Sequence, residues 1–322
     1  MKKLLYRFIY LLVLGILTFL LVSAFGRMGQ KTTSSASPTE NCRKVQHVLG
    51  ATCVPVNPER LATIFHVTLG HALTLGVKPI ASTIINLQHP FPEYLMDKLQ
   101  GVKPLGSQNE PNLEKIALAK PDLILGWDRI QSTYPLLSQI SPTALGSWDG
   151  PVSWREYFNF VADVLGKQQE ARQAWEHYYQ RVDELKKALG NRYQDQEISV
   201  VAPSMHWGYF LQAKNSFVGS VFDDIGLKRP TVQDVDTSHG YVILNSVEEL
   251  AMMDGDVLFV LTFEADEKEA FDKILQSPLG KTLKATQHNR VYSVNTLTWN
   301  GGNLLAADAV IDDLFKYLVN KS

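Results

Sequence analysis

The feature that most constrains the fold is a helix–strand unit that occurs twice. Residues 111–126 read Pro-Asn-Leu-Glu-Lys-Ile-Ala-Leu-Ala-Lys-Pro-Asp-Leu-Ile-Leu-Gly. Asn112 can cap a helix, apolar residues follow at helical spacing, and Pro121 ends the helix before a short apolar strand. Residues 246–260 align with 112–126 without a gap, so that Glu114 corresponds to Glu248. The repeat predicts two similar α/β lobes; chance similarity between amphipathic helices is the competing explanation.

Three further sequence patterns accompany this repeat: a second repeated run, two capping boxes and a long amphipathic helix. A Leu-Gly-Val-Lys-Pro run at 75–79 returns as Ile-Gly-Leu-Lys-Arg-Pro at 225–230, in the same order relative to each unit. Ser246 with Glu249, and Ser153 with Glu156, have the spacing of a capping box. Residues 167–189 carry apolar side chains on one helical face and end before Gly190, which predicts one long, stiff helix between the lobes.

Composition excludes several classes of protein. The chain has 322 residues, a formal net charge of −2 and 45% hydrophobic residues. A chain of this length can form two ordinary cores, and this charge gives no field for nucleic acid or an acidic membrane surface. No Gly-x-Ser-x-Gly, His-Glu-x-x-His or Gly-x-Gly-x-x-Gly motif is present, and the eight histidines form no i, i+4 pair. These observations argue against an enzyme and against a receptor for a bare metal ion, so we predict no metal site and no cofactor.

The N-terminal residues occur in the order that is typical of an export signal, with basic residues before an apolar run. Lys2, Lys3 and Arg7 precede an apolar run over residues 8–25. The run is also long enough to span a bilayer, so residues 1–25 are either a cleaved signal peptide or a membrane anchor. Residues 26–41 are polar and predict a flexible linker. We therefore expect the protein outside the cytoplasm, in the periplasm or at the cell surface.

The two cysteines stand in a predicted hairpin. Cys42 and Cys53 flank two alternating runs with a Leu-Gly turn region between them. A hairpin would bring them within bridging range, and an oxidising compartment would keep the bond. We predict a Cys42–Cys53 disulfide.

Short motifs spread over the chain from Cys42 onward resemble those of one family. They are Val54-Pro-Val-Asn-Pro-Glu-Arg, Leu75-Gly-Val-Lys-Pro, Glu110-Pro-Asn-Leu-Glu-Lys-Ile with Lys120-Pro-Asp-Leu-Ile, Ser216-Phe-Val-Gly-Ser, Asp256-Val-Leu-Phe-Val, Ser277-Pro-Leu with Arg290-Val-Tyr, and Trp299-Asn-Gly-Gly. As a set they resemble the helical-backbone (class III) substrate-binding proteins of bacterial ABC importers for ferric siderophores, which include ferrichrome-, ferric citrate- and vitamin B12-binding proteins.

The resemblance implies an architecture and a function. The fold would be α/β, with two Rossmann-like lobes (42–150 and 191–322) joined by a helical region (151–190) and a ligand cleft between them. The protein would bind a ferric siderophore and deliver it to the permease dimer of an inner-membrane ABC importer, working as a monomer. Iron would be carried only within the siderophore. A haem or corrinoid receptor of the same fold is the alternative, with His206 as a possible axial ligand; an exported enzyme using His206 as acid or base is a further one.

The candidate ligand residues follow predicted strands, because open α/β sheets bind ligands beyond the carboxyl ends of their strands. Aromatic walls and one or two cations suit a bulky, polar ferric complex. The candidates that follow strands are His66, Gln108, Trp127, Arg129, His206, Trp207, Tyr209 and Trp299; Tyr241 is a further candidate, expected in the loop before the second-lobe helix.

Each candidate has a plainer interpretation. Trp127 and Tyr209 could be core aromatics, Arg129 a solvated charge and His66 a surface imidazole. Gln108 also occupies a position where ferrichrome-type relatives have a ligand-binding arginine, and Ala202-Pro203 stand where many have another. Fewer cations favour a less anionic ligand, of a hydroxamate or mixed type, over a highly anionic ferric citrate.

One acid in each lobe is a candidate for docking. Glu114 and Glu248 lie at equivalent positions of the repeated unit, at the second residue of each predicted helix. The resemblance implies that these acids bind arginines of the permease dimer. The simpler interpretation is that both complement helix dipoles.

Overall fold

The computed structural model describes residues 42–204, 208–263 and 265–320. The predicted signal or anchor (1–25) and linker (26–41), and the candidates His206 and Trp207, lie outside these residues. No helix within the described ranges is long and apolar enough to cross a membrane.

The described chain begins with a two-stranded antiparallel hairpin, β1 (Cys42–His47) and β2 (Gly50–Pro55). The Cys42–Cys53 disulfide is present, with 5.5 Å between the two Cα atoms, which confirms the prediction. Arg43 donates to the carbonyls of Asp163 and Val164 at 3.0 and 2.8 Å, and so caps the end of helix α5 (Trp154–Leu165). The hairpin is therefore fixed at its base by the disulfide and to the lobe by Arg43.

The first sheet contains five parallel strands in the order β5-β4-β3-β6-β7. Each strand is short and strongly buried in its centre, as expected where helices cover both faces. The strands are β3 (Leu61–Ile64), β4 (Ala81–Ile84), β5 (Lys103–Ser107), β6 (Leu123–Trp127) and β7 (Thr143–Gly146). Its helices are α2 (His66–Thr74), η1 (Glu93–Lys98), α3 (Leu113–Ala119), η2 (Asp128–Thr133) and α4 (Tyr134–Ile140).

The repeated unit forms in the first sheet as the sequence predicts. Asn112 accepts the backbone N–H of Lys115 at 2.8 Å and caps α3. Lys120 ends the helix in a left-handed conformation, with φ 49°, and all of β6 is buried.

The second sheet has the order β10-β9-β8-β11-β12 and is mixed. Strands β8, β11 and β12 are parallel, whereas β9 runs antiparallel to both of its neighbours. The strands are β8 (Ile198–Ser204), β9 (Gly208–Gln212), β10 (Tyr241–Leu244), β11 (Val257–Thr262) and β12 (Val291–Asn295). Its helices are α7 (Phe217–Ile225), η4 (Val247–Met253), α8 (Ala265–Leu275), η5 (Gly280–Thr282), α9 (Lys284–Gln287) and α10 (Thr296–Trp299).

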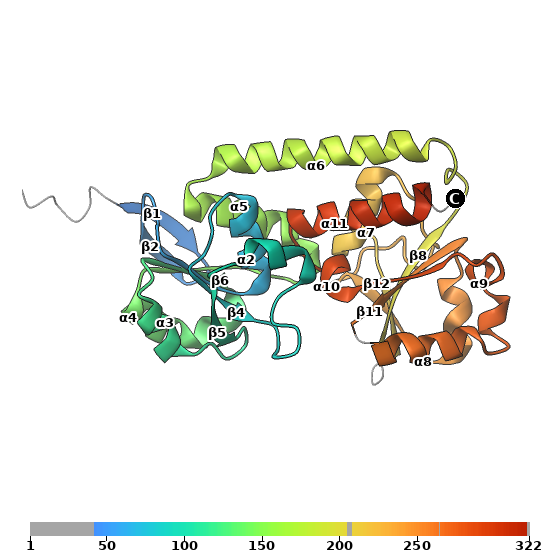
Figure 1. The fold of residues 1–322 in the computed structure, drawn as a ribbon, viewed down its shortest axis with the longest axis horizontal. Helices are drawn as coiled ribbons and strands as arrows, with labels where there is room; N and C mark the ends of the chain where they lie inside the picture. The colour runs from blue at the N-terminus through green and yellow to red at the C-terminus, as the bar shows by residue number, and fades with distance from the viewer. Residues whose placement is uncertain (1–41, 205–207, 264, 321–322) are drawn as a thin grey trace, which may run out of the picture. The chain divides into compact units, whose positions relative to one another are not determined.

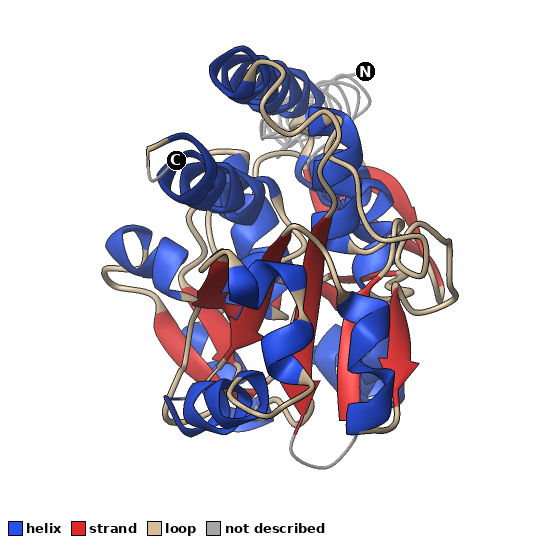
Figure 2. Cartoon of the chain, turned by 90° about the vertical axis from the view of Figure 1, so that its right-hand side faces the viewer, coloured by secondary structure: helices blue, strands red, loops and turns tan. Residues whose placement is uncertain are grey.

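A helical layer joins the two sheets. After η3 (Pro151–Ser153) and α5, α6 runs as one helix over Gln168–Leu189 and contacts α5, α7 and the late helix α11 (Leu304–Leu314). Figure 1 shows α6 along the top, above both sheets, with α11 directly beneath it. The buried side chains of this layer, of the first sheet and of one face of the second sheet form one continuous cluster, whereas the other face of the second sheet packs in a separate cluster. Figure 2 shows helices on both sides of the strands.

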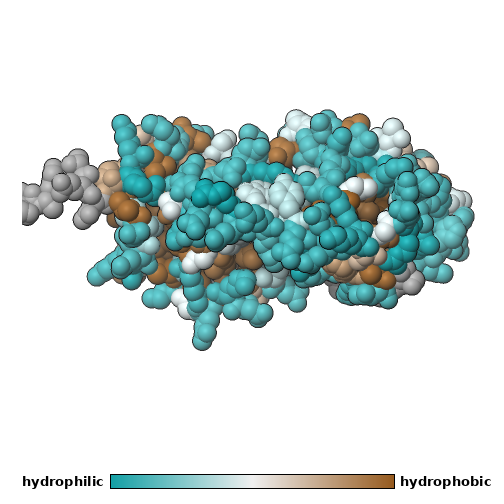
Figure 3. Space-filling model, turned by 90° about the horizontal axis from the view of Figure 1, so that it is seen from above, coloured by the Kyte–Doolittle hydropathy of each residue, from teal (hydrophilic) through white to brown (hydrophobic). Residues whose placement is uncertain are grey.

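The outer surface of this layer is polar, as the helix pattern predicts. The face seen in Figure 3 is largely hydrophilic, with apolar side chains scattered over it. Inward-facing residues of α6, such as Tyr178, Val182 and Leu185, are buried. A helix that is apolar on one side only covers a core in this way.

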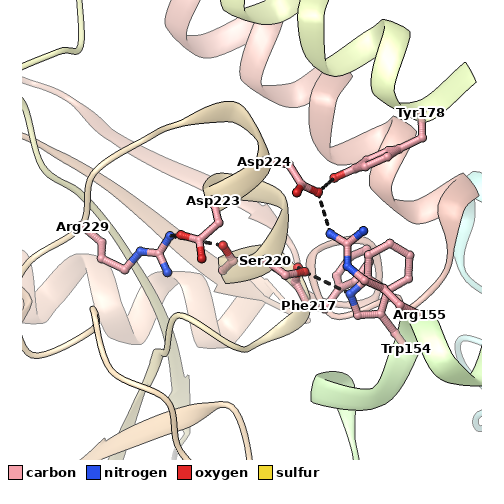
Figure 4. A network of polar contacts seen from close by, with 9 residues as sticks. Trp154, Arg155, Tyr178, Phe217, Ser220, Asp223, Asp224 and Arg229 are labelled. Carbon is pink, nitrogen blue, oxygen red and sulfur yellow. Dashed lines mark hydrogen bonds and ion pairs between the residues drawn. The ribbon is translucent and has the colours of Figure 1, made fainter. Parts of the chain in front are cut away.

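A polar network ties α7 to α5 and α6 (Figure 4). Arg155 pairs with Asp224 at 2.5 Å, and Tyr178 donates to the same carboxylate at 2.6 Å. The Arg155 guanidinium also lies over the Trp154 ring, 4.4 Å from its centroid. Trp154 in turn donates to Ser220 at 3.0 Å. Second-lobe helix α7 is thus attached to the connecting helices by charge as well as by packing.

Two predicted capping boxes do not form. Ser153 is the last residue of the 3₁₀ turn η3 and has φ −103° and ψ 15°, so it lacks the extended conformation of a cap. Its hydroxyl donates to the Gly150 carbonyl instead. Ser246 accepts no capping bond although its backbone is extended, and Glu249 accepts the N–H of Asn245 rather than that of Ser246.

The last helix connects to both lobes. Residues 304–319 divide into α11 and a final π-helical turn, η6 (Phe315–Val319). Helix α11 contacts α2 and η1 of the first lobe as well as α7 of the second. Asn303, its N-cap, donates to the Tyr94 hydroxyl at 2.8 Å.

Candidate functional site

An aromatic pair stands at the carboxyl edge of the first sheet. The register places Ile64 beside Gly126, so the next residues of the adjacent strands β3 and β6, Phe65 and Trp127, meet. Their rings stack 3.9 Å apart, with 7° between the planes, and both are almost fully buried. A Cβ on Gly126 would lie 3.2 Å from the Ile64 side chain, so glycine is what lets the strands approach here. The stacked Phe65 ring therefore fixes the position of the Trp127 ring, which forms the rigid base of the site.

Arg129 extends over this base. It lies in η2, directly after β6, with its guanidinium carbon 5.2 Å from the Trp127 ring centroid. Its side chain is exposed and has no carboxylate partner among the described residues. The neighbouring Asp128 is occupied elsewhere, since it accepts the Trp148 N–H at 3.2 Å. The arginine therefore keeps an unused positive charge at the sheet edge.

Trp127 also keeps an unused donor. Its indole Nε1 is buried and has no hydrogen-bond partner within the described part of the chain. A buried donor without a partner costs free energy, and a bound acceptor would remove that cost. Arg129 and Trp127 together offer two hydrogen-bond donor groups, a guanidinium and an indole N–H, at one strand end.

His66 and Gln108 form a second polar pair at the same edge. His66 Nδ1 lies 2.8 Å from Gln108 Oε1, although the two residues follow different strands, β3 and β5. Burial lowers the pKa of His66, and the hydrogen bond to Gln108 raises it by less, so the ring is neutral at neutral pH. A neutral ring that donates from Nδ1 presents Nε2 as an acceptor. The pair adds hydrogen-bonding capacity without adding charge.

In the second lobe, Tyr209 and Tyr241 have different surroundings. Tyr209 is the second residue of the antiparallel strand β9, is 9% exposed, and packs against Phe271 with 6.1 Å between ring centroids. It lines a pocket of about 270 Å³ with Pro203, Ser204 and residues of α8. Tyr241 begins β10, rather than lying in a loop as expected, and its half-buried ring contacts Phe210 at 4.9 Å.

Trp299 is a core residue, which corrects the expectation that it contacts a ligand. Its side chain has no exposed surface and donates from Nε1 to Asp313 at 2.9 Å. Phe259 packs against it with 4.6 Å between ring centroids. A side chain with neither accessible area nor a free donor cannot bind a ligand in this arrangement.

The carboxyl edges of the two sheets meet at one contact. His89, in the loop after β4, packs edge-on against Phe263, which follows β11, with 4.8 Å between centroids. Next to it, Leu87 is 87% exposed, an unusual state for a large apolar side chain. The loop after β4, at the carboxyl edge of the first sheet, therefore contacts the second lobe.

Several residues of this region were not predicted from the sequence, including Phe65, Trp148, His89 and Phe263. Phe65 forms the stack under Trp127, and Trp148 packs edge-on against Phe65 at 5.2 Å. Each missed residue follows a strand by one to five positions, so a search of every strand end would have found them.

Glu114 and Glu248 are both exposed at the starts of α3 and η4. Hydrogen bonds from its own backbone and from Ser246 lower the pKa of Glu248. Neither acid has an ion-pair partner among the described residues, so both present a negative charge to solvent.

The fold and this edge define a binding protein with two α/β lobes. No group of three or more His, Cys, Asp or Glu within the described ranges could hold a metal ion. Residues 68–296 match the periplasmic binding protein family (Peripla_BP_2), and the chain belongs to that family.

Relatives and solved structures agree with this assignment. The chain is 29% identical, over 97% of its own length and 98% of the relative's, to the protein named "Probable siderophore-binding lipoprotein YfiY" of Bacillus subtilis. It is 28% identical to the achromobactin-binding periplasmic protein of Dickeya dadantii, over 80% of this chain and 85% of that one. The structure of Staphylococcus aureus SirA complexed with staphyloferrin B superimposes with a TM-score of 0.74 at 28% identity, covering 86% of this chain and 98% of SirA.

Proposed function

We propose that the protein is an extracytoplasmic receptor that binds a ferric siderophore and delivers it to an ABC importer, and that it is not an enzyme. The observation that carries this proposal is the His89–Phe263 contact, which brings the loop after β4 of the first sheet against the residue that follows β11 of the second sheet. The relatives' names supply the ligand class, since they describe siderophore- and achromobactin-binding proteins. The lobes would be 42–150 and 191–322, joined by 151–190, with export directed by residues 1–25.

The ligand would lie against the Trp127–Arg129 pair. Arg129 would bind one carboxylate or other oxygen anion of the complex, since a guanidinium can donate two parallel hydrogen bonds. The neutral His66–Gln108 pair would bind uncharged oxygen or N–H groups. Arg129 is the cation at this base, and burial keeps His66 neutral, so a complex with little negative charge fits better than a multiply anionic one. Tyr209, Tyr241, His206 and Trp207 would complete the site from the second lobe.

The test is a titration followed by tryptophan fluorescence. Ferric desferrioxamine, ferric citrate, a ferric tris-catecholate, haemin and cobalamin are added to the purified protein. We expect quenching by at least one ferric siderophore, and a roughly tenfold weaker Kd for Arg129→Ala than for the parent, with Arg129→Lys in between. A Soret band with haemin and no response to the siderophores would favour the haem receptor and contradict the proposal.

Docking to the permease would use Glu114 and Glu248. Both acids are exposed, unpaired among the described residues, and equivalent in the repeat. Reversing both charges (Glu114→Arg, Glu248→Arg) should abolish iron uptake by cells while leaving ligand affinity unchanged. Continued uptake would refute the docking role and leave the ligand assignment intact.

A further inference from the structure

One face of the second sheet is partly bare. The register places Ala202, Phe210 and Ile243 opposite one another on the adjacent strands β8, β9 and β10. Directly paired residues point to the same face of a sheet, so these three side chains form one row across it. Ala202 and Phe210 are half-buried, and Ile243 is 44% exposed. An exposed apolar row is unexpected in an α/β lobe, because helices normally cover both faces of its sheet.

The other face of the same strands is covered. Tyr209 and Leu244 are paired one position along from the row, and both are buried in the cluster that contains Phe271 of α8. Successive residues of a strand point to opposite faces. Tyr209 therefore packs against α8, whereas its neighbour Phe210 stands on the bare face.

The helical cover of the bare face stops just before the row. Val200, two residues before Ala202 on β8, is buried in the cluster that contains Phe217 of α7. Gln212, two residues after Phe210 on β9, is buried as well. The row therefore lies beyond α7, toward the carboxyl end of β8.

The row also lies close to the junction of the lobes. Gly240 directly precedes β10, and a Cβ on it would lie 3.3 Å from the Val152 side chain. Val152 belongs to η3, which leads from the first lobe into the connecting helices. The start of β10 therefore packs against the connection between the lobes, and the bare row follows it at the carboxyl edge of the second sheet.

The row is apolar and bordered by an aromatic ring. Phe210 meets Tyr241 edge-on, with 4.9 Å between ring centroids and 85° between the planes. Tyr241 stands on the same face as Ile243, two residues away on β10. The row itself carries no charge, and Ala202 leaves space beside the Phe210 ring. Rings in this arrangement suit a flat, apolar group, which can stack on one ring and meet the edge of the other.

We propose that Phe210, Tyr241 and Ile243 form an aryl-binding subsite, so that the ligand is a ferric siderophore that carries an aromatic ring. The inference rests on the proposed receptor function and deepens it, because it assigns an aryl group to the second lobe while Arg129 and the His66–Gln108 pair bind polar groups in the first. A protein partner fits less well. Stable protein interfaces bury about 800 Å² on each side, whereas a buried aromatic side chain supplies about 150 to 250 Å².

The experiment compares two ferric complexes that differ only in a ring. Desferrioxamine is acylated at its terminal amine with either an acetyl or a benzoyl group, and each ferric complex is titrated into the purified protein by tryptophan fluorescence. We expect the benzoyl complex to bind about fivefold more tightly than the acetyl complex. Phe210→Leu and Ile243→Ser should bring this ratio close to one and leave the Kd of the acetyl complex unchanged.

The variants are chosen to keep the fold. Ile243 is already largely exposed, and Phe210→Leu removes the ring but keeps an apolar side chain. The matched control is Leu49→Ser in the hairpin turn, because Leu49 is exposed to the same degree as Ile243 but lies outside the row. The control should keep the preference for the benzoyl complex. The urea midpoint of each variant shows whether the fold is unchanged.

The outcomes separate this inference from the proposed function. Equal affinity for the two complexes in the parent, or a preference that both variants keep, overturns the aryl subsite and leaves the receptor function standing. If neither hydroxamate complex binds, the ferric tris-catecholate takes their place, and an affinity that both substitutions leave unchanged overturns the subsite. Binding of no ferric complex refutes the receptor function itself. A receptor dimer in sedimentation that Ile243→Ser dissociates would show that the row serves self-association, which also overturns the inference.

Discussion

Asp122 and Asp256 make one equivalent contact in the two sheets, with the backbone N–H of the residue that precedes the neighbouring strand. Asp122 accepts the backbone N–H groups of Glu59 and Arg60 at 2.8 and 3.0 Å, and Arg60 directly precedes β3. Asp256 accepts the N–H of Glu197 at 2.8 Å, and Glu197 directly precedes β8. The two copies of the repeat therefore share a hydrogen bond as well as a sequence pattern. In each sheet this bond joins the Asp carboxylate before one strand to the backbone before the neighbouring parallel strand, and so aligns the two strands.

This relationship predicts unequal costs of substitution. Asp122 accepts two backbone hydrogen bonds and Asp256 accepts one, so we expect Asp122→Ala to cost about 2 kcal/mol and Asp256→Ala about 1 kcal/mol of the free energy of unfolding. Asp122→Asn keeps one acceptor oxygen and should cost less. Urea denaturation measures these differences. Equal losses at both positions would show that the two carboxylates do not act through these bonds.

A buried histidine predicts loss of stability in acid. His71 in α2 has no exposed surface, and neither ring nitrogen has a partner within the described residues. Burial lowers the pKa of His71 from 6.5 to about 3. Between these values the unfolded state binds a proton that the folded state does not, so the free energy of unfolding falls by up to about 1.4 kcal/mol for each pH unit below 6.5.

His71→Leu tests this slope, because leucine cannot be protonated and is close to histidine in size. Near pH 8 the His71 ring is neutral in both states and contributes no slope. We expect the stability of the variant to fall less than that of the parent between pH 6 and pH 4, by about 2 to 3 kcal/mol. Urea denaturation at several pH values gives both curves. Parallel curves would mean that His71 accepts a proton in the folded state.

The disulfide predicts a redox-dependent stability. Cys42 and Cys53 are 11 positions apart, and a closed loop of this size restricts the unfolded chain by about 3 kcal/mol. Replacing both with serine, or adding a reductant, should lower the free energy of unfolding by up to that amount. The two treatments should not add to each other. A thiol count of two on the unfolded, unreduced protein would contradict the bond.

The Arg155–Asp224 pair predicts a large cost for removing one partner. Both side chains are about three-quarters buried, with 26% and 23% exposed, and the guanidinium also lies over Trp154 (Figure 4). Asp224→Ala should cost about 3 kcal/mol, because it leaves Arg155 charged, partly buried and without its carboxylate.

A matched pair provides the control for this prediction. Arg181 and Asp312 also lie 2.5 Å apart, but Asp312 is 69% exposed. Asp312→Ala should cost less than about 1 kcal/mol. A double-mutant cycle of Arg155 and Asp224 measures their coupling, and a coupling as small as that of the exposed pair would contradict this account.

The sequence by itself determined the features that depend on local order. The repeated helix–strand unit, the cysteine hairpin with its disulfide, the long helix and its stop at Gly190 all follow from periodicity, caps and turn residues. Their bounds agree with the structure because each depends on residues within a few positions of one another. Family membership could be expected for the same reason, from short motifs in a fixed order.

The tertiary structure decided which side chains are available. Trp127 and Trp299 both follow predicted strands, yet one keeps an unpartnered donor at a sheet edge and the other is enclosed by Phe259 and Asp313. The antiparallel β9, the failed cap at Ser153 and the contact of α11 with both lobes likewise depend on partners far away in the chain. Exposure and pairing are set by residues that are distant in sequence, so local pattern alone cannot specify them.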